Sequence, residues 1–380
     1  MVREPVHRIT QLDAWTVPFA EPNDDNCIRC VTLVRITDEA GGEGWGECVT
    51  LFTEASVACT ALLREWRDLI VGLPATPESV RAAITERWWW YGGGGIASFA
   101  RAGVDIAMWD LASRTREVSL VDALGGAVHE NLPIFISSHA ARANLDSEAD
   151  RWAGWVDGAT AAGVKVGFGK RGEANLGFDH DRDVDFMRRL RGALGDETKI
   201  CIDLGVRNRW SVDEAVRRTR AFEEHDLYWI EEPLGPDNPH GYRTLKDSTH
   251  ALIAYGEREW TVAGISRIAD SHTVDVVGID AGRMEGVTGS SDATALLASQ
   301  GVQANAHAFS GPIIYAAGLA LSLTSSACRQ FEVTPLRNQL FDILGVPLPE
   351  AVGGKVSALP GPGLGISIDV DRVNALALER

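Results

Sequence analysis

The sequence predicts an α/β fold in which a closed barrel of parallel strands follows a smaller α+β domain. From Leu132 onward, eight short apolar runs rich in valine and isoleucine alternate with helical stretches, a pattern typical of repeated strand-helix units. The starts of these runs are 24 to 35 residues apart, which is the length of one strand, one helix and two loops. Eight such units close a TIM-type barrel.

The expected strands can be listed in chain order. They are Pro133–Ser137, Val164–Phe168, Lys199–Asp203, Tyr228–Glu231, Leu252–Gly256, Val276–Asp280, Val302–Ala306 and Gln330–Val333. Between them lie amphipathic stretches such as Val212–Glu224, which Ser211 is expected to cap. An open, doubly wound sheet is the alternative architecture, because periodicity does not show whether a sheet closes.

The first 130 residues have a different pattern and form the separate α+β domain (1–130). Alternating stretches at Cys30–Thr37 and Gly44–Val49 predict strands, and Glu54–Ile70 and Ile96–Arg114 predict helices. The barrel is expected over 131–340. A tail over 341–380, which includes the sequence GPGLGISIDV, is expected to return to the first domain and add one more strand.

Charge excludes some classes of partner. With 36 Lys and Arg against 53 Asp and Glu, the net charge is -17, so nucleic acid and anionic membranes are repelled. The start MVREPVHRIT lacks the apolar run of a signal peptide, so we expect a cytoplasmic protein whose six cysteines are reduced. The uncharged stretch Ala308–Cys328 has helix start and stop signals at Ser310–Pro312 and Thr324–Ser326, which favours a buried helix over a membrane span.

Polar side chains follow the expected strands where catalytic groups lie in such barrels, at the carboxyl ends. From the second strand to the eighth they are Lys165, Asp203, Glu231, Glu257, Asp280, His307 and Glu332. Each could alone be a solvated loop residue. Their presence after seven consecutive strands instead predicts one site at one rim of the barrel.

Three of these residues suggest a metal. Asp203, Glu231 and Glu257 follow consecutive strands, so their carboxylates are expected to converge within a few ångströms and to repel one another. A hard divalent cation with oxygen ligands relieves that repulsion, and Mg²⁺ fits this set.

Proton transfer is suggested by the neighbours of the metal ligands. Asp280 and His307 follow adjacent strands, so the carboxylate can hold the imidazole in one tautomer and raise its basicity. Lys165 faces them across the mouth. The alternative is a structural histidine that only donates hydrogen bonds.

The sequences around these residues resemble the enolase superfamily, of the mandelate racemase type, over nearly the full chain. The similar segments are VKVG at Lys165, CIDLG at Asp203, WIEEP at Glu231, YGERE at Glu257, VGIDAGRMEGVTG at Asp280, QANAHAF at His307, AGVDIAMWDLASR at Ala102–Arg114 and LGG from Leu124. The resemblance implies a (β/α)7β barrel under a capping domain made of the N-terminal region and the C-terminal tail. It also implies that Asp203, Glu231 and Glu257 bind Mg²⁺, that Lys165 and His307 are bases on opposite faces, and that Glu332 binds the substrate carboxylate.

The chain departs from the family pattern at two positions. Gly163 lies where a first lysine is common, and Lys170 could supply the missing charge. Gly205 lies where Asn is frequent, and Asn208 or Arg207 could replace it. Arg283 and the RNRW run ending at Trp210 add cationic groups suited to an anionic, hydroxyl-rich substrate.

These residues predict an enzyme that removes the proton beside a substrate carboxylate. The favoured activity is a hydro-lyase, an acid-sugar dehydratase that forms a 2-keto-3-deoxy acid; a racemase or epimerase and a cycloisomerase are alternatives. A non-catalytic protein that binds sugar acids is the alternative from another class. Which of Lys165 and His307 takes the proton is left open, and we expect a homo-oligomer that binds neither nucleic acid nor membrane.

Overall fold

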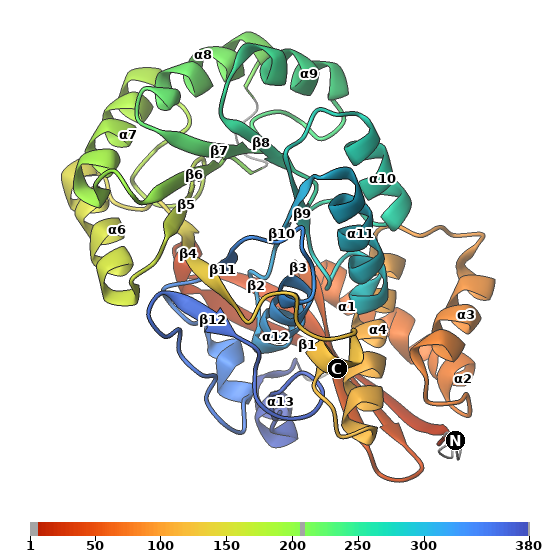
Figure 1. Cartoon of the computed structure of the whole chain (residues 1–380). Coiled ribbons are helices and arrows are strands. Elements are labelled where there is room, and N and C mark those ends of the chain that lie inside the picture. The colour runs from red at the N-terminus through yellow and green to blue at the C-terminus, as the bar shows by residue number, and fades with distance from the viewer. Residues whose placement is uncertain (1–6, 206–209, 379–380) are drawn as a thin grey trace.

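The computed structural model describes residues 7–205 and 210–378 of the chain. It begins with an antiparallel sheet of three strands, β1 (Ile9–Glu21), β2 (Cys27–Asp38) and β3 (Glu43–Leu51). Figure 1 shows this sheet beneath the barrel, with the orange helices beside it. Strands β2 and β3 confirm the two predicted stretches, whereas β1 was not predicted: its mixed residues become a strand by pairing with β2 along nearly their whole length.

The helices of this part differ from prediction, because the first predicted helix is interrupted and a further helix that was not predicted follows it. The expected helix Glu54–Ile70 is broken at Trp66 into α1 (Thr53–Glu65) and α2 (Arg67–Ile70), and α3 (Pro77–Trp88) follows. Helix α4 (Ile96–Thr115) is buried along most of its length against β3. This close contact requires glycine, since a Cβ at Gly46 would lie 1.9 Å from the carbonyl oxygen of Gly103.

Eight parallel strands form the barrel, and each matches a predicted run to within a few residues. They are β4 (Asn131–His139), β5 (Gly163–Gly167), β6 (Lys199–Asp203), β7 (Leu227–Glu231), β8 (Leu252–Tyr255), β9 (Val276–Ile279), β10 (Gln303–Ala306) and β11 (Phe331–Val333). Strands β4 to β10 pair in chain order, and β11 pairs with β4. A bridge from Ala304 to Cys328, just before β11, joins the two ends of the sheet. The closed barrel is therefore confirmed, and the open-sheet alternative is wrong.

Helices cover the outside of the barrel (Figure 1). They are α6 (Leu145–Ala159), α7 (His180–Leu194), α8 (Val212–Glu223), α9 (Pro239–Ser248), α10 (Val262–Asp270), α11 (Gly286–Gln300) and α12 (Pro312–Leu323), and α5 (Leu120–Ala123) precedes them. Ser211 caps α8 as predicted, accepting a hydrogen bond from the Glu214 N–H. Helix α12 is the expected buried helix. Within the described residues, none of the helices has the length and apolar character needed to span a bilayer.

The tail returns to the N-terminal sheet by a different route from the one predicted. After η2 (Gln339–Ile343), strand β12 (Lys355–Ser357) pairs antiparallel with β4, and α13 (Val370–Leu376) follows. The Leu378 N–H donates to the Thr16 carbonyl of β1 at 2.9 Å. The tail therefore contains the one further strand that was expected, but this strand precedes GPGLGISIDV and pairs with the barrel instead of the first domain. GPGLGISIDV itself forms no strand and is held by Asp110 and Arg114 of α4, which bond to the backbone of Leu364 and Ile366. We call the N-terminal sheet, its helices and α13 the cap.

Candidate active site

A cavity of about 480 Å³ lies between the cap and the carboxyl ends of the barrel strands. Six of the seven predicted strand-end residues line it, and Glu231 is buried beside Lys165. Lys170 and Arg283 also line the cavity. Asn208 and Arg207 lie outside the described residues. The structure thus brings the predicted ionisable groups into one site.

Each of the three expected metal ligands lies near a different cation. Lys170 Nζ lies 3.4 Å from Asp203 Oδ2, Lys165 Nζ lies 3.1 Å from Glu231 Oε2, and His307 Nε2 lies 3.7 Å from Glu257 Oε2. Within residues 7–205 and 210–378, no group of three Asp, Glu, His or Cys side chains has closed to metal-binding geometry. Each carboxylate thus has a cation beside it, and the Mg²⁺ site expected at Asp203, Glu231 and Glu257 stays a prediction.

The donor set nevertheless fits a hard divalent cation. Asp203 and Glu231 are register neighbours on β6 and β7, and Glu257 follows β8. Glu231 Oε2 is buried and accepts no hydrogen bond from a described residue, although Lys165 is near. Burial, together with the charges of Asp203 and Glu257, raises the pKa of Glu231 well above its usual value despite Lys165. These buried oxygens are the ligands that Mg²⁺ prefers.

His307 and Asp280 form the predicted pair. His307 Nδ1 lies 2.8 Å from Asp280 Oδ2, and Asp280 Oδ1 accepts the Gly282 N–H at 2.9 Å. Burial lowers the pKa of His307, but Glu257 and Asp280 outweigh it and raise that pKa to about 9. With Nδ1 held by Asp280, Nε2 is the ring nitrogen left for proton transfer.

Lys165 is held between two carboxylates. Its Nζ lies 3.1 Å from Glu231 Oε2 and 2.9 Å from Glu332 Oε2. Burial lowers the pKa of Lys165, but the charges of Glu231 and Glu332 outweigh it and raise that pKa well above its usual value. Glu332 is itself fixed, since Asn305 Nδ2 donates to its Oε1 at 2.6 Å.

The structure explains both departures from the family pattern. A Cβ at Gly163 would lie 2.9 Å from the Lys199 carbonyl oxygen and 2.9 Å from the Phe135 ring, so a lysine has no room there. Gly205 has φ of 54°, and a Cβ there would lie 2.5 Å from Lys170 Nζ. Lys170 therefore reaches the site as the sequence suggested, and it fills the space beside Gly205.

Arg283 lines the cavity but is fixed by packing. Its guanidinium carbon lies 3.5 Å from the centroid of the Trp260 ring, and its Nε donates to the Arg258 carbonyl oxygen at 3.0 Å. Arg258 in turn pairs with buried Glu232. A direct role for Arg283 in substrate binding stays a prediction.

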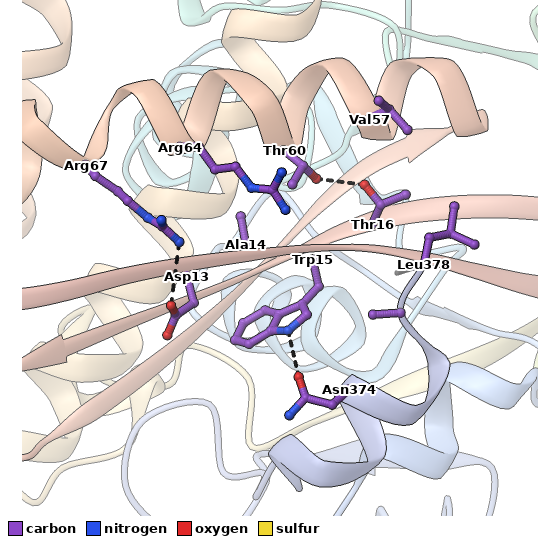
Figure 2. A pocket seen from close by; sticks show the side chains of 11 residues that line it. Asp13, Ala14, Trp15, Thr16, Val57, Thr60, Arg64, Arg67, Asn374 and Leu378 are labelled. Atoms are coloured by element: carbon purple, nitrogen blue, oxygen red, sulfur yellow. Dashed lines mark hydrogen bonds and ion pairs between the residues drawn. The ribbon is translucent and has the colours of Figure 1, made fainter. Parts of the chain in front are cut away.

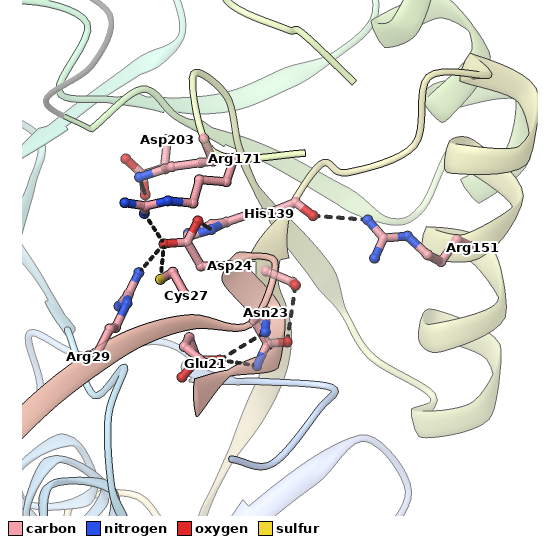
Figure 3. A network of polar contacts seen from close by, with 11 residues as sticks. Glu21, Asn23, Asp24, Cys27, Arg29, His139, Arg151, Arg171 and Asp203 are labelled. Atoms are coloured by element: carbon pink, nitrogen blue, oxygen red, sulfur yellow. Dashed lines mark hydrogen bonds and ion pairs between the residues drawn. The ribbon is translucent and has the colours of Figure 1, made fainter. Parts of the chain in front are cut away.

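Sequence reasoning missed a polar cluster where the cap meets the barrel (Figure 3). Asp24 ends the short helix η1 (Pro22–Asp24). Its Oδ1 lies 3.2 Å from His139 Nδ1, while its Oδ2 accepts from Arg29 at 2.9 Å and from Arg171 at 3.1 Å. His139 ends β4, so the rule applied to the other seven strands would have found it. Asp24 had no such signal, because His139 and Arg171 are distant from it in sequence. Arg29 is close to Asp24 in sequence, but neither residue follows a barrel strand.

A second cavity, of about 350 Å³, lies on the outer face of the cap between β1, α1 and α13 (Figure 2). Its polar side chains bond to one another within the cap; for example, Trp15 Nε1 donates to Asn374 Oδ1 at 2.9 Å. None of the strand-end residues lines this cavity. The predicted strand-end residues therefore point to the cavity between cap and barrel as the candidate site.

Similar proteins include enzymes that act on sugar acids. The chain is 28% identical over 350 residues to a 3,6-anhydro-alpha-L-galactonate cycloisomerase of Streptomyces coelicolor, covering 91% of each chain. It is 25% identical over 362 residues to a D-gluconate dehydratase of Thermoproteus tenax, covering 93% of this chain and 71% of that protein.

Solved structures share the fold. A 3,6-anhydro-D-galactonate cycloisomerase from Zobellia galactanivorans superimposes with a TM-score of 0.87 at 20% identity, covering 98% of this chain and 100% of that one. A racemase from Streptomyces coelicolor with bound magnesium gives 0.84 at 23% identity, covering 97% and 100%.

Two family models match the chain. Residues 13–125 match the N-terminal domain of mandelate racemase and muconate lactonizing enzyme, and residues 147–373 match the enolase C-terminal domain-like family. Together with the barrel and its strand-end residues, these matches show that the chain belongs to the enolase superfamily, in the mandelate racemase and muconate lactonizing enzyme family.

Proposed function

We propose that this enzyme catalyses β-elimination from a sugar acid and forms a 2-keto-3-deoxy acid. The observation that supports this proposal best is one cavity that combines the His307–Asp280 pair and the Lys165–Glu332 ion pair with Asp203 and Glu257, while Glu231 is buried beside Lys165. A base removes the proton on C2, beside the carboxylate, and the resulting electron pair expels the oxygen on C3. The enol then takes up a proton at C3 and becomes the ketone.

His307 is the base in this proposal. Asp280 holds Nδ1 at 2.8 Å, so that Nε2 takes the proton in the deprotonated state of the ring. Lys165 is engaged by two carboxylates, and Gly163 leaves no space for a second lysine beside it. Its ammonium therefore serves as a fixed positive charge that stabilises the negative charge growing on the substrate carboxylate.

Asp203, Glu231 and Glu257 are the residues that would hold Mg²⁺. A bound divalent cation supplies Lewis-acid stabilisation of the enediolate, which neither a lysine nor a histidine provides alone. The relative crystallised with magnesium supports this choice of metal.

The oxygen that leaves C3 decides the reaction class. If it is a hydroxyl, it departs as water with the proton that the base removed from C2, and the enzyme is a dehydratase, which is the activity we favour. If it is a ring ether, it stays bonded to its other carbon, nothing is lost from the substrate, and the enzyme is a cycloisomerase. The relative named as an anhydrogalactonate cycloisomerase supports this second candidate, and the one named as a gluconate dehydratase supports the first.

Incubation with Mg²⁺ and a panel of aldonic, aldaric, lactone and 3,6-anhydro acids tests the proposal. Semicarbazide detects 2-keto products, and mass spectrometry separates the classes: a dehydratase product is lighter by one water, and a cycloisomerase product has the substrate's mass. Product should disappear in excess EDTA and return with Mg²⁺. Binding of these acids without product from any of them would instead support a non-catalytic sugar-acid binding protein.

A further inference from the structure

The cap-side cluster, defined as Asp24, Arg29, His139 and Arg171, points to the substrate class. We propose that Arg29 and Arg171 bind a second carboxylate at the far end of the substrate, so that the substrate is an aldaric acid or another sugar-derived dicarboxylate. This inference rests on the proposed function, which places the first carboxylate beside Lys165 and Glu332.

The cluster carries an excess of positive charge. Both guanidinium groups share one oxygen, Asp24 Oδ2, at 2.9 and 3.1 Å. Asp24 Oδ1 faces His139 Nδ1 at 3.2 Å. Burial lowers the pKa of His139 to about 4, although Asp24 opposes this, so the imidazole is neutral near pH 7. One carboxylate thus faces two permanent cations, and one positive charge is left for a ligand.

The guanidinium groups also keep unused donors. Arg29 donates one terminal N–H to Asp24 and also bonds to the Cys27 side chain, so these two partners engage only part of its five-donor fork. Its side chain is 16% exposed and lies 5.2 Å from the centroid of the Phe309 ring. Arg171, 53% exposed at the rim, is bonded through one nitrogen. Partly desolvated guanidinium donors that line a cavity favour an anionic, bidentate acceptor.

The rest of the cap wall favours a carboxylate over a hydroxyl-rich end. Around Arg29, the cap contributes apolar side chains to the cavity, namely Ile28, Val49, Leu51 and Phe52. The remaining cap residues of the lining, Asp24 and Cys27, bond to each other. Apart from Arg29, the described cap side chains in this lining offer mainly apolar contacts to hydroxyls, whereas a carboxylate pairs with the guanidinium groups directly.

Binding to matched acids tests the inference independently of turnover. Calorimetry uses the His307→Asn variant with Mg²⁺, and compares galactarate with galactonate and glucarate with gluconate, pairs that differ in the oxidation of C6. At least one diacid should bind about tenfold or more tightly than its monoacid. Adding Arg29→Gln should weaken binding of that diacid by about tenfold to a hundredfold and binding of the monoacid by less than about threefold. Arg29→Lys in its place should restore part of the lost affinity for the diacid.

Controls separate a local effect from a general one. Arg171→Gln should also weaken binding of the diacid more than binding of the monoacid. Because Arg171 is exposed, this loss would not be explained by misfolding. Arg64→Gln makes the same charge change at the outer cap cavity and should leave both affinities unaltered (Figure 2). Equal affinities for diacid and monoacid would overturn the inference. So would equal losses of affinity for the two acids in the Arg29→Gln variant, or no binding of either acid. Selective diacid binding with no product from the wild type would leave the inference standing and refute the proposed function.

Discussion

At the scale of single residues, the roles of Lys165 and His307 follow from what holds each of them. Lys165 has carboxylates at 2.9 and 3.1 Å, an arrangement that favours a permanent cation. His307 is held through Nδ1 by Asp280 and keeps Nε2 available. The sequence placed both residues at the rim but left their division of labour open, because it could not show that Lys165 sits between Glu231 and Glu332.

Glu231→Gln should abolish turnover and weaken Mg²⁺ binding by at least about tenfold, because the neutral amide removes one anionic ligand. Calorimetric titration with Mg²⁺ and the 2-keto product assay measure the two effects. Glu224→Gln, the same change at an exposed position of the chain after α8, is the control and should behave as wild type. Mg²⁺ affinity unchanged in Glu231→Gln would remove this residue from the ligand set.

At the scale of elements, the inner layer of the barrel accounts for Gly163. Phe135 of β4 stacks on Trp229 of β7 with ring centroids 5.8 Å apart, and this layer also contains Cys201, Ala254 and Val276. The aromatic pair occupies the space that a longer side chain on β5 would need.

Gly163→Ala should therefore lower the free energy of unfolding by about 1–3 kcal/mol, because the new methyl group overlaps the Phe135 ring and the Lys199 carbonyl oxygen. Denaturant unfolding measures the loss. Gly154→Ala in α6 is the control, since a Cβ there meets nothing within 4 Å, and it should stabilise by about 0.5–1 kcal/mol. Equal stability of Gly163→Ala and wild type would contradict this packing.

The barrel was predictable from the sequence because strands buried on both faces are continuous apolar runs and their carboxyl ends meet at one rim. The cap was less predictable. β1 has no clean alternation and forms by pairing with β2, and the tail segment at Leu364 is fixed by contacts with Asp110, which is distant in sequence. The same limit applies at the site, where Asp24 meets His139 across 115 residues. Local patterns carry no information about such pairs.

At the scale of the whole molecule, the cap and the barrel are joined by buried polar contacts. Glu47 of β3 accepts hydrogen bonds from the backbone of Gly311 at 2.9 Å and of Ile314 at 3.1 Å, at the start of α12, and from the Ser310 hydroxyl. Burial raises the pKa of Glu47 to about 7, although these hydrogen bonds oppose the shift. This joint is therefore sensitive to pH.

A carboxyl whose pKa is higher in the folded than in the unfolded state stabilises fully at low pH and loses that contribution as pH rises through the folded value. For Glu47 this loss occurs over the pH range from 4.5, the ordinary pKa of a glutamate, to about 7, its pKa in the folded protein. Between pH 5 and pH 8, the unfolding free energy of wild type should fall by roughly 2–3 kcal/mol relative to that of Glu47→Gln, whatever the difference between the two proteins at pH 5. Urea unfolding at several pH values measures the difference, and parallel pH curves for the two proteins would refute it.

The central claim, that His307 removes the proton beside the substrate carboxylate, is tested most directly by hydrogen exchange at C2. The sugar acid that the wild type consumes is incubated in D₂O with Mg²⁺ and the His307→Asn variant, and the recovered acid is examined by NMR. We predict neither product nor deuterium at C2, while His250→Asn, an exposed control, turns over like wild type. Deuterium at C2 in the acid recovered from His307→Asn would contradict the claim and make another group, Lys165 first, the base.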